Sequence, residues 1–137
     1  GHGGGGGVDA TPGQFYGRII TISSQGGRSV SKLGGAHYTT SKAAVIGLTR
    51  AAAFEMGEHG ITCNAVCPGV CNTEMAMRQF ANPGAARASS GKVLEAIPVR
   101  RLGEMSDIAN VCKFLGTPLS GYMNGACLDV NGGNLML

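Results

Sequence analysis

Three short runs of apolar residues, each bounded by turn-forming residues, predict three β-strands. The β-branched run at residues 18–24 predicts the first strand. The run at 61–66 predicts a second, buried strand that stops at Pro68-Gly69. Residues 126–130 predict the third strand, which Asn131-Gly132-Gly133 closes as a turn.

The segments between these runs predict helices, which fall at residues 38–59, in parts of 73–94, and at 106–115. The first is rich in alanine, and Gly60 is expected to end it. Asn82-Pro83-Gly84 is expected to interrupt the second. Ser106 is the expected N-cap of the third. A polar loop is expected over residues 25–37.

The order strand, helix, strand, helices, strand implies parallel pairing with right-handed crossovers, and hence the α/β class. With 137 residues, of which 14% are charged, the chain suits one domain of ordinary size. We assign residues 17–137 to that folded unit. The glycine-rich segment 1–16 is expected to be a flexible leader or linker, because no strand precedes it to form a phosphate-binding loop.

Charge and composition narrow the set of partners and the compartment. The formal net charge is only +3 and the basic residues are scattered, so no nucleic acid partner is expected. No apolar stretch reaches membrane-spanning length, so no membrane partner is expected. Five cysteines without a secretory context indicate reduced thiols in a cytoplasmic protein.

The even spacing of Cys63, Cys67 and Cys71 suggests a metal site. Cys63 and Cys67, however, stand at the two ends of the extended run CNAVC, where four residues span about 13 Å. Zinc needs each sulfur at about 2.3 Å from one ion. We therefore expect buried thiols and no metal.

The most informative residues are Ser24, Tyr38 and Lys42. Reduction of a ketone, or oxidation of an alcohol, needs a proton donor or acceptor beside the carbonyl oxygen. A lysine one helical turn from a tyrosine favours the phenolate, and a serine at a strand end can hydrogen-bond the same carbonyl. Each motif alone is weak, since Tyr-x-x-x-Lys is common by chance on solvated helix faces.

Their context resembles the short-chain dehydrogenase/reductase family, and in particular its 3-oxoacyl-reductase-like members. The resemblance covers residues 17–133 and is carried by GRIITISS, YTTSK, ITCNAVCPGVCNT, IPVRRLGEMSDIANVCKFL and LDVNGG. It implies a partial Rossmann-like, doubly wound parallel sheet: the C-terminal half, with about three strands and flanking helices. It also implies a nicotinamide cofactor, NAD or NADP, and a small alcohol or carbonyl substrate.

The resemblance implies a catalytic role for each of the three residues. Tyr38 would be the general acid/base, and Lys42 would favour its phenolate and hydrogen-bond the nicotinamide ribose. Ser24 would polarise the substrate carbonyl. The loop from Ser24 to Tyr38 is one residue longer than the commonest spacing, so Ser23 stays open as the weaker alternative.

The resemblance also implies a cofactor site. Pro68, Gly69 and Val70 would line the nicotinamide, and Thr73 would hold its carboxamide or the pyrophosphate. His37 is either a loop residue or faces the substrate. A segment that covers the substrate in the family would include Cys71, Met75, Met77 and Phe80, whose apolar character favours a partly apolar substrate.

The family's dinucleotide fingerprint and the residue that selects between NAD and NADP are absent from this sequence. Three explanations are open. The chain is a fragment of a longer enzyme, which we favour, or one half of a split enzyme completed by an N-terminal half. Alternatively, it is a non-catalytic interaction module, since its active-site helix and last strand would be oligomer surfaces in the family. The expected protein partner is either another copy of the chain, in a homo-oligomer, or a complementing N-terminal half.

Overall fold

The computed structural model describes residues 17–81 and 90–137. The expected leader at 1–16 and the expected interruption at 82–84 lie outside the described residues. In chain order the elements are β1 (Gly17–Ile22), α1 (Gln25–Arg28), α2 (Gly35–Gly57), β2 (Ile61–Pro68), α3 (Glu74–Phe80), α4 (Ser90–Ala96), α5 (Met105–Leu115), a 3₁₀ turn (Pro118–Ser120) and β3 (Cys127–Val130).

The three strands form one parallel sheet in the order β1-β2-β3. Each of the three predicted strands is present, and the α/β class is confirmed. β2 is central, and its residues 62–67 are all buried. Within the described part of the chain, β1 and β3 form the two edges.

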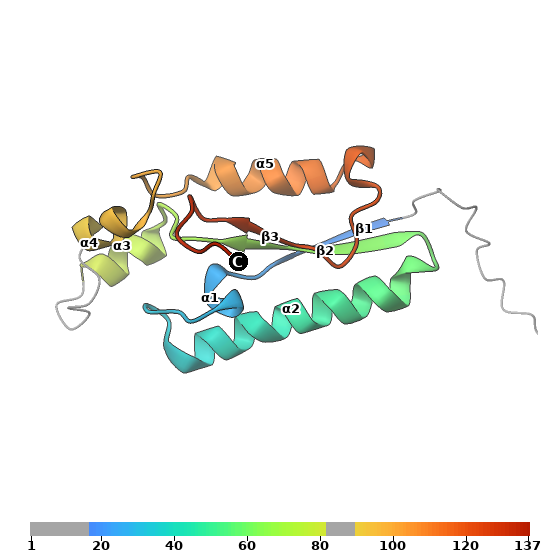
Figure 1. The fold of residues 1–137 in the computed structure, drawn as a ribbon, viewed down its shortest axis with the longest axis horizontal. Coiled ribbons are helices and arrows are strands. Elements are labelled where there is room, and N and C mark those ends of the chain that lie inside the picture. The colour runs from blue at the N-terminus through green and yellow to red at the C-terminus, as the bar shows by residue number, and fades with distance from the viewer. Residues whose placement is uncertain (1–16, 82–89) are drawn as a thin grey trace, which may run out of the picture.

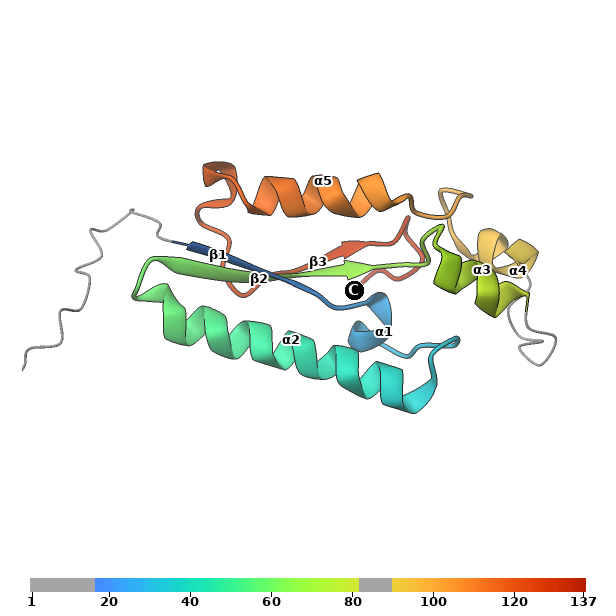
Figure 2. The same cartoon turned by 180° about the vertical axis from the view of Figure 1, so that it is seen from behind.

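Helices cover both faces of the sheet, with α1 and α2 on one side and α5 on the other (Figures 1 and 2). The alternation of side chains along β2 explains this arrangement. Ala65 and Cys67 point to one face and pack with Ile46 of α2. Val66 points to the other face, where it packs with α5 residues that include the fully buried Leu115.

Two asparagines fix the turn into β3 by hydrogen bonds to backbone groups. Asn64 donates from Nδ2 to the carbonyl of Met123 (2.8 Å) and accepts at Oδ1 from the N–H of Ala126 (3.0 Å). Asn124 accepts from the N–H of Cys63 and donates to the carbonyl of Ala53 in α2. The side-chain amides of these two asparagines are therefore paired, as a stable interior requires.

Three details of the helix prediction are wrong. The first long helix begins at Gly35 rather than at 38, and the expected polar loop contains the short helix α1. The N-cap of α5 is Glu104, not Ser106. Asp107 accepts a hydrogen bond of 2.8 Å from the N–H of Glu104, and Glu104 accepts one in return from the third helical N–H. This acidic capping box satisfies the first turn, so no serine cap is needed.

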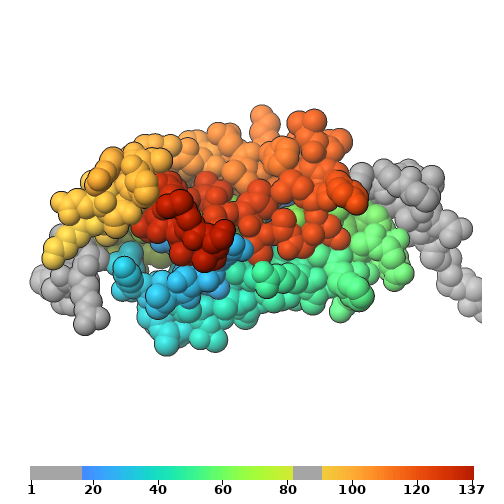
Figure 3. Space-filling model, viewed as in Figure 1, coloured from blue at the N-terminus to red at the C-terminus, as the bar shows by residue number. Residues whose placement is uncertain are grey.

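The carboxyl ends of the three strands meet at one edge of the sheet, beyond which α3 and α4 lie (Figure 1). Figure 3 shows the C-terminal residues, in red, between the surface of α5 and that of α1 and α2. Open α/β sheets bind their ligands at the carboxyl ends of the strands. Among the residues described, no helix combines the length and apolarity needed to cross a membrane.

Candidate active site

Lys42 ties α2 to the carboxyl end of β1. Its Nζ donates a hydrogen bond of 3.1 Å to the carbonyl O of Ile22, the last residue of β1. In the other direction, the Oγ of Ser23 donates a hydrogen bond of 2.7 Å to the carbonyl O of Lys42. Gly27 of α1 lies against the same backbone, since a Cβ built there would lie 2.6 Å from the carbonyl C of Lys42. The strand end, α1 and α2 are thus held together around this lysine.

Tyr38 lies one helical turn before Lys42, on the same face of α2. The Nζ of Lys42 lies 5.9 Å from the centre of the Tyr38 ring, which is within cation–π range. The ring also lies against Gly34, where an added Cβ would be 2.5 Å from the ring carbon Cγ. The structure therefore brings the phenol, the ammonium group and the end of β1 together.

Ser23 and Ser24 are both buried, at 3% and 8% exposed, but their hydroxyls have different partners. The hydroxyl of Ser23 donates its proton to the carbonyl of Lys42. Ser24 is the N-cap of α1, and its Oγ accepts a hydrogen bond of 3.0 Å from the N–H of Gly26. An accepting hydroxyl still has its own proton to donate, as polarisation of a carbonyl requires. These contacts favour Ser24 over Ser23, and its catalytic role stays a prediction.

The segment 68–70 begins at Pro68, the last residue of β2, at the same edge of the sheet. The N–H of Gly69 donates a hydrogen bond of 2.9 Å to the carbonyl of Val130, at the end of β3. A Cβ built on Gly69 would lie 2.8 Å from the Cα of Asn131, so a larger residue would push the two turns apart. The expected cofactor-lining residues Pro68, Gly69 and Val70 thus lie between the ends of β1 and β3.

Thr73 is the N-cap of α3, and its Oγ1 accepts a hydrogen bond of 3.2 Å from the N–H of Ala76. Beyond it, Met75 and Met77 are exposed at 68% and 40%. His37 is exposed in the first turn of α2. The roles that the family resemblance implies for these residues remain predictions.

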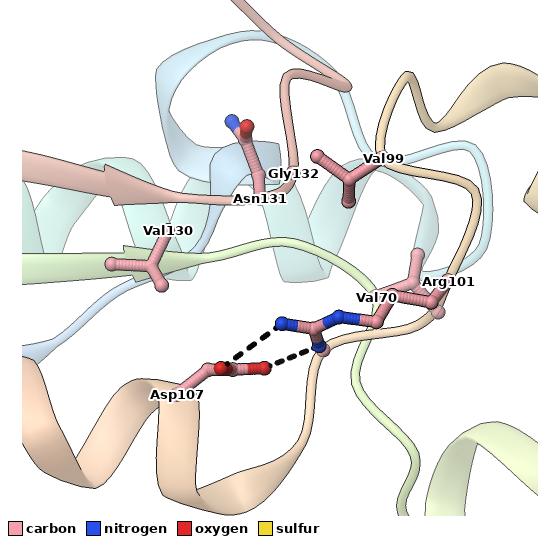
Figure 4. A pocket seen from close by; sticks show the side chains of 8 residues that line it. Val70, Val99, Arg101, Asp107, Val130, Asn131 and Gly132 are labelled. Atoms are coloured by element: carbon pink, nitrogen blue, oxygen red, sulfur yellow. Dashed lines mark hydrogen bonds and ion pairs between the residues drawn. The ribbon is translucent and has the colours of Figure 1, made fainter.

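An ion pair that the sequence analysis missed supports the segment after Val70. The guanidinium of Arg101 donates two hydrogen bonds to the carboxylate of Asp107, at 2.6 and 3.2 Å (Figure 4). Between them in sequence, Gly103 donates to the carbonyl of Val70 (3.0 Å) and accepts from the N–H of Asn72 (2.7 Å). Glu104 and Asp107, three residues apart at the start of α5, are the sequence signal for this capping arrangement.

A cavity of about 400 Å³ lies beside this ion pair, lined by Val70, Val99, Arg101, Gly103, Asp107, Val130, Asn131 and Gly132 (Figure 4). The hydrogen bonds from Arg101, and then that from the backbone N–H of Glu104, lower the pKa of Asp107 to about 2. The carboxylate is therefore ionised at neutral pH and holds Arg101 at the cavity rim.

The cysteines are all free thiols. Cys63 and Cys67 both lie in the extended strand β2, as the argument against zinc assumed. Burial, and then the nearby Cys127 and Asp129, raise the pKa of Cys67 to about 11. In the described ranges, no three histidine, cysteine or acidic side chains are grouped as metal ligands would be.

Gln25 is another residue whose importance the sequence did not predict. It follows Ser24 directly, and its side-chain Oε1 is buried without a hydrogen-bond partner among the described residues. The same atom would lie 3.2 Å from a Cβ built on Gly69. Sequence reasoning alone gives no signal for it, because the amide is significant only through its place between two strand ends.

Comparison with known proteins identifies the family. A family model described as enoyl-(acyl carrier protein) reductase matches residues 10–134. The (3R)-3-hydroxyacyl-CoA dehydrogenase of Rattus norvegicus is 42% identical over 120 residues, which are 88% of this chain and 44% of the rat protein. The chain belongs to the short-chain dehydrogenase/reductase family.

Solved structures agree with this assignment. A 3-oxoacyl-[acyl-carrier protein] reductase from Brucella melitensis matches with a TM-score of 0.77 and 31% identity, over 88% of this chain and 42% of that chain. A protein from Agrobacterium tumefaciens described as a 2-deoxy-D-gluconate 3-dehydrogenase with bound NADP matches with a TM-score of 0.71 and 32% identity, over 89% of this chain and 47% of that one. These relatives point to the use of NAD(P) by the family. The chain spans less than half the length of each of these three proteins.

Proposed function

We propose that this chain is the catalytic half of an NAD(P)-dependent oxidoreductase that interconverts an alcohol and a ketone. The observation that carries the proposal is the placement of Tyr38 and Lys42 at the end of β1, where Lys42 donates to the carbonyl of Ile22. A proton-transfer pair at the carboxyl edge of a parallel sheet lies where such folds bind their ligands.

The proposed proton chemistry uses three side chains. Ser24 donates its hydroxyl proton in a hydrogen bond to the substrate carbonyl oxygen and so orients it. The phenol of Tyr38 gives its proton to the developing alkoxide during reduction, or takes it from the alcohol during oxidation. The ammonium group of Lys42 stabilises the phenolate that remains. Since Lys42 has three N–H donors and uses one on Ile22, further donors remain for the ribose of a cofactor.

The residues present fit the nicotinamide end of the cofactor. Pro68, Gly69 and Val70 would line the ring and Thr73 would hold its carboxamide or the pyrophosphate. The Oε1 of Gln25 beside Gly69, which has no partner in the described part of the chain, supports this fit, because a buried acceptor at the strand ends matches a ligand that carries hydrogen-bond donors. When bound, NAD(P) supplies or accepts the hydride.

We further propose that the chain acts together with a cofactor-binding N-terminal half, as part of a longer protein or as a separate chain. The chain matches less than half the length of each of these relatives, which supports this proposal. So does β1, an edge strand with Ile19 and Ile22 exposed at 41% and 44%. We propose a cytoplasmic homo-oligomer that acts on a small alcohol or carbonyl substrate, with the 3-hydroxyacyl thioesters named in the rat relative as the first class to test.

A second candidate is a non-catalytic interaction module. Phe54 and Leu48, both on α2, are exposed at 89% and 65%, and an apolar helix face of this kind favours association. That function would not depend on Tyr38 or Lys42, and this separates it from the enzymatic proposal.

Cofactor binding by the full chain tests the enzymatic proposal. We expect NADH or NADPH to raise the melting temperature and to change its own fluorescence on binding. Lys42→Met should weaken this binding about tenfold or more, because it removes a charged donor. Lys113→Met, the same change at an exposed position of α5, is the control and should bind as the wild type does. A folded wild-type chain that binds neither cofactor would show that it is not an enzyme by itself.

A further inference from the structure

The amide of Gln25 lies where three strand ends converge. Gln25 is the first residue of α1 and follows Ser24, which caps that helix. Its Oε1 lies against Gly69, in the turn that follows β2. Gly69 in turn is hydrogen-bonded to the end of β3 and in contact with Asn131. The side chain therefore reaches from the end of β1 across the turn after β2.

The Oε1 of Gln25 is buried and has no partner in residues 17–81 and 90–137. A buried acceptor without a donor destabilises a fold, so native structures rarely keep one without a reason. The amide of Asn131, its neighbour across Gly69, is already engaged with the carbonyl of Leu135 and the N–H of Gly133. The hydrogen bonds that the described residues show for Asn131 thus go to Leu135 and Gly133, and none of them reaches Gln25.

One neighbour on α1 needs separate consideration. The Nε of Arg28 is the other buried side-chain atom without a partner in the described residues. Its guanidinium is held from the other side by an ion pair of 3.1 Å with Asp129. A hydrogen bond between Gln25 and Arg28 in solution would make Gln25 a purely structural residue, and its loss in Gln25→Met would then lower the melting temperature.

We propose that Gln25 binds the ligand directly, through a hydrogen bond. Its Oε1 accepts a hydrogen bond from an N–H or O–H group of the small molecule that binds at the strand ends. This rests on the proposed function. Two groups could supply the donor: the carboxamide N–H of the nicotinamide or a hydroxyl of the substrate. The position of Oε1 beside Gly69, rather than on α2 beside Tyr38, favours the carboxamide.

The test compares Gln25→Met with the wild-type chain, with Asn110→Met at an exposed position of α5 as the control. Methionine keeps the length of the side chain and removes the acceptor. In the absence of ligand, we expect Gln25→Met to raise the melting temperature by about 3 °C or more, because the unpaired acceptor is gone. It should also weaken the binding of NADH about 3- to 10-fold, which is the loss of one hydrogen bond.

An analogue identifies the donor. Acetylpyridine adenine dinucleotide has a methyl group in place of the carboxamide nitrogen, so it should bind to wild type and Gln25→Met equally. If the loss appears instead only when 3-hydroxybutyryl-CoA is bound, the donor is the substrate hydroxyl.

Two results would overturn the inference while the proposed function stands. One is wild-type affinity of Gln25→Met for every probe. The other is a lower melting temperature of the unliganded variant, which would mean that Gln25 is already paired within the chain. If the wild type itself binds no probe, the proposed function fails first and this inference fails with it.

Discussion

Alanine substitutions at the two neighbouring serines should lower stability by similar amounts but differ in their effect on catalysis. Ser23→Ala removes a 2.7 Å hydrogen bond to the carbonyl of Lys42, and the N–H of Ser23 keeps its bond of 2.8 Å to Val66. That carbonyl lies inside α2 and also accepts within the helix, so it is not left unpaired. We therefore expect Ser23→Ala to lower the free energy of unfolding by about 1 kcal/mol, or about 4 °C in melting temperature.

Ser24→Ala should destabilise the fold by a similar amount, because it removes the N-cap hydrogen bond to Gly26. Loss of such a cap costs about 1 kcal/mol. The two variants should differ in catalysis, however. We expect Ser24→Ala to slow hydride transfer about 100-fold or more, as loss of a hydrogen bond to a developing oxyanion does. Ser23→Ala should keep rates within a few-fold of wild type.

The assay pairs urea unfolding of each variant with the oxidation of NADH or NADPH by acetoacetyl-CoA, at a temperature where both variants are folded. Equal loss of activity in the two variants would refute the assignment of Ser24. Unchanged stability of Ser23→Ala would refute the role of its hydroxyl in holding α2.

Three further predictions concern the packing and titration of the scaffold. Gly27→Ala should lower the free energy of unfolding, measured in urea, by about 1–3 kcal/mol, because the added Cβ would meet the backbone of Lys42. The control Gly47→Ala in α2 meets nothing within 4 Å and should raise the free energy of unfolding by up to about 1 kcal/mol, so equal effects would contradict the packing of α1 on α2. Because the pKa of Asp107 is lowered to about 2 in the folded chain, the wild type should be more stable than Asp107→Asn above pH 3.8, and this difference in free energy of unfolding should disappear as the pH falls to about 2. A difference that does not change with pH would argue against the ion pair. Burial raises the pKa of Cys67 to about 11, so peptide mass mapping should find this thiol unmodified by iodoacetamide at pH 8 in the native chain and modified in urea. Rapid labelling of the native chain would contradict the burial of Cys67.

Much of the fold could be predicted from the sequence, because the pattern of apolar runs follows from burial. β2 is buried on both faces and is largely apolar in sequence, apart from Thr62 and Asn64. The element order permits little besides a parallel sheet. Helix boundaries were harder. α1 contains two glycines, which disfavour helix, and forms because Ser24 caps it and Gly27 packs closely on α2.

The candidate site was only partly readable from the sequence. The spacing of Tyr38 and Lys42 indicates one helix face, but the hydrogen bond from Lys42 to Ile22 depends on how α2 packs on the sheet. Gln25 and Arg101 were missed for the same reason. Their significance comes from partners distant in sequence or in another element: Gly69 for Gln25, and Asp107 at the start of α5 for Arg101.

The central claim is that the Tyr38 phenol, held beside Lys42 at the end of β1, carries the proton that accompanies hydride transfer. The most direct measurement is the rate at which the chain, alone or with an N-terminal half, oxidises NADH or NADPH in the presence of acetoacetyl-CoA. Tyr38→Phe should slow this rate about 100-fold or more while cofactor binding persists. Tyr122→Phe, at a fully exposed tyrosine, should leave the rate unchanged. A Tyr38→Phe variant as active as the wild type would contradict the claim.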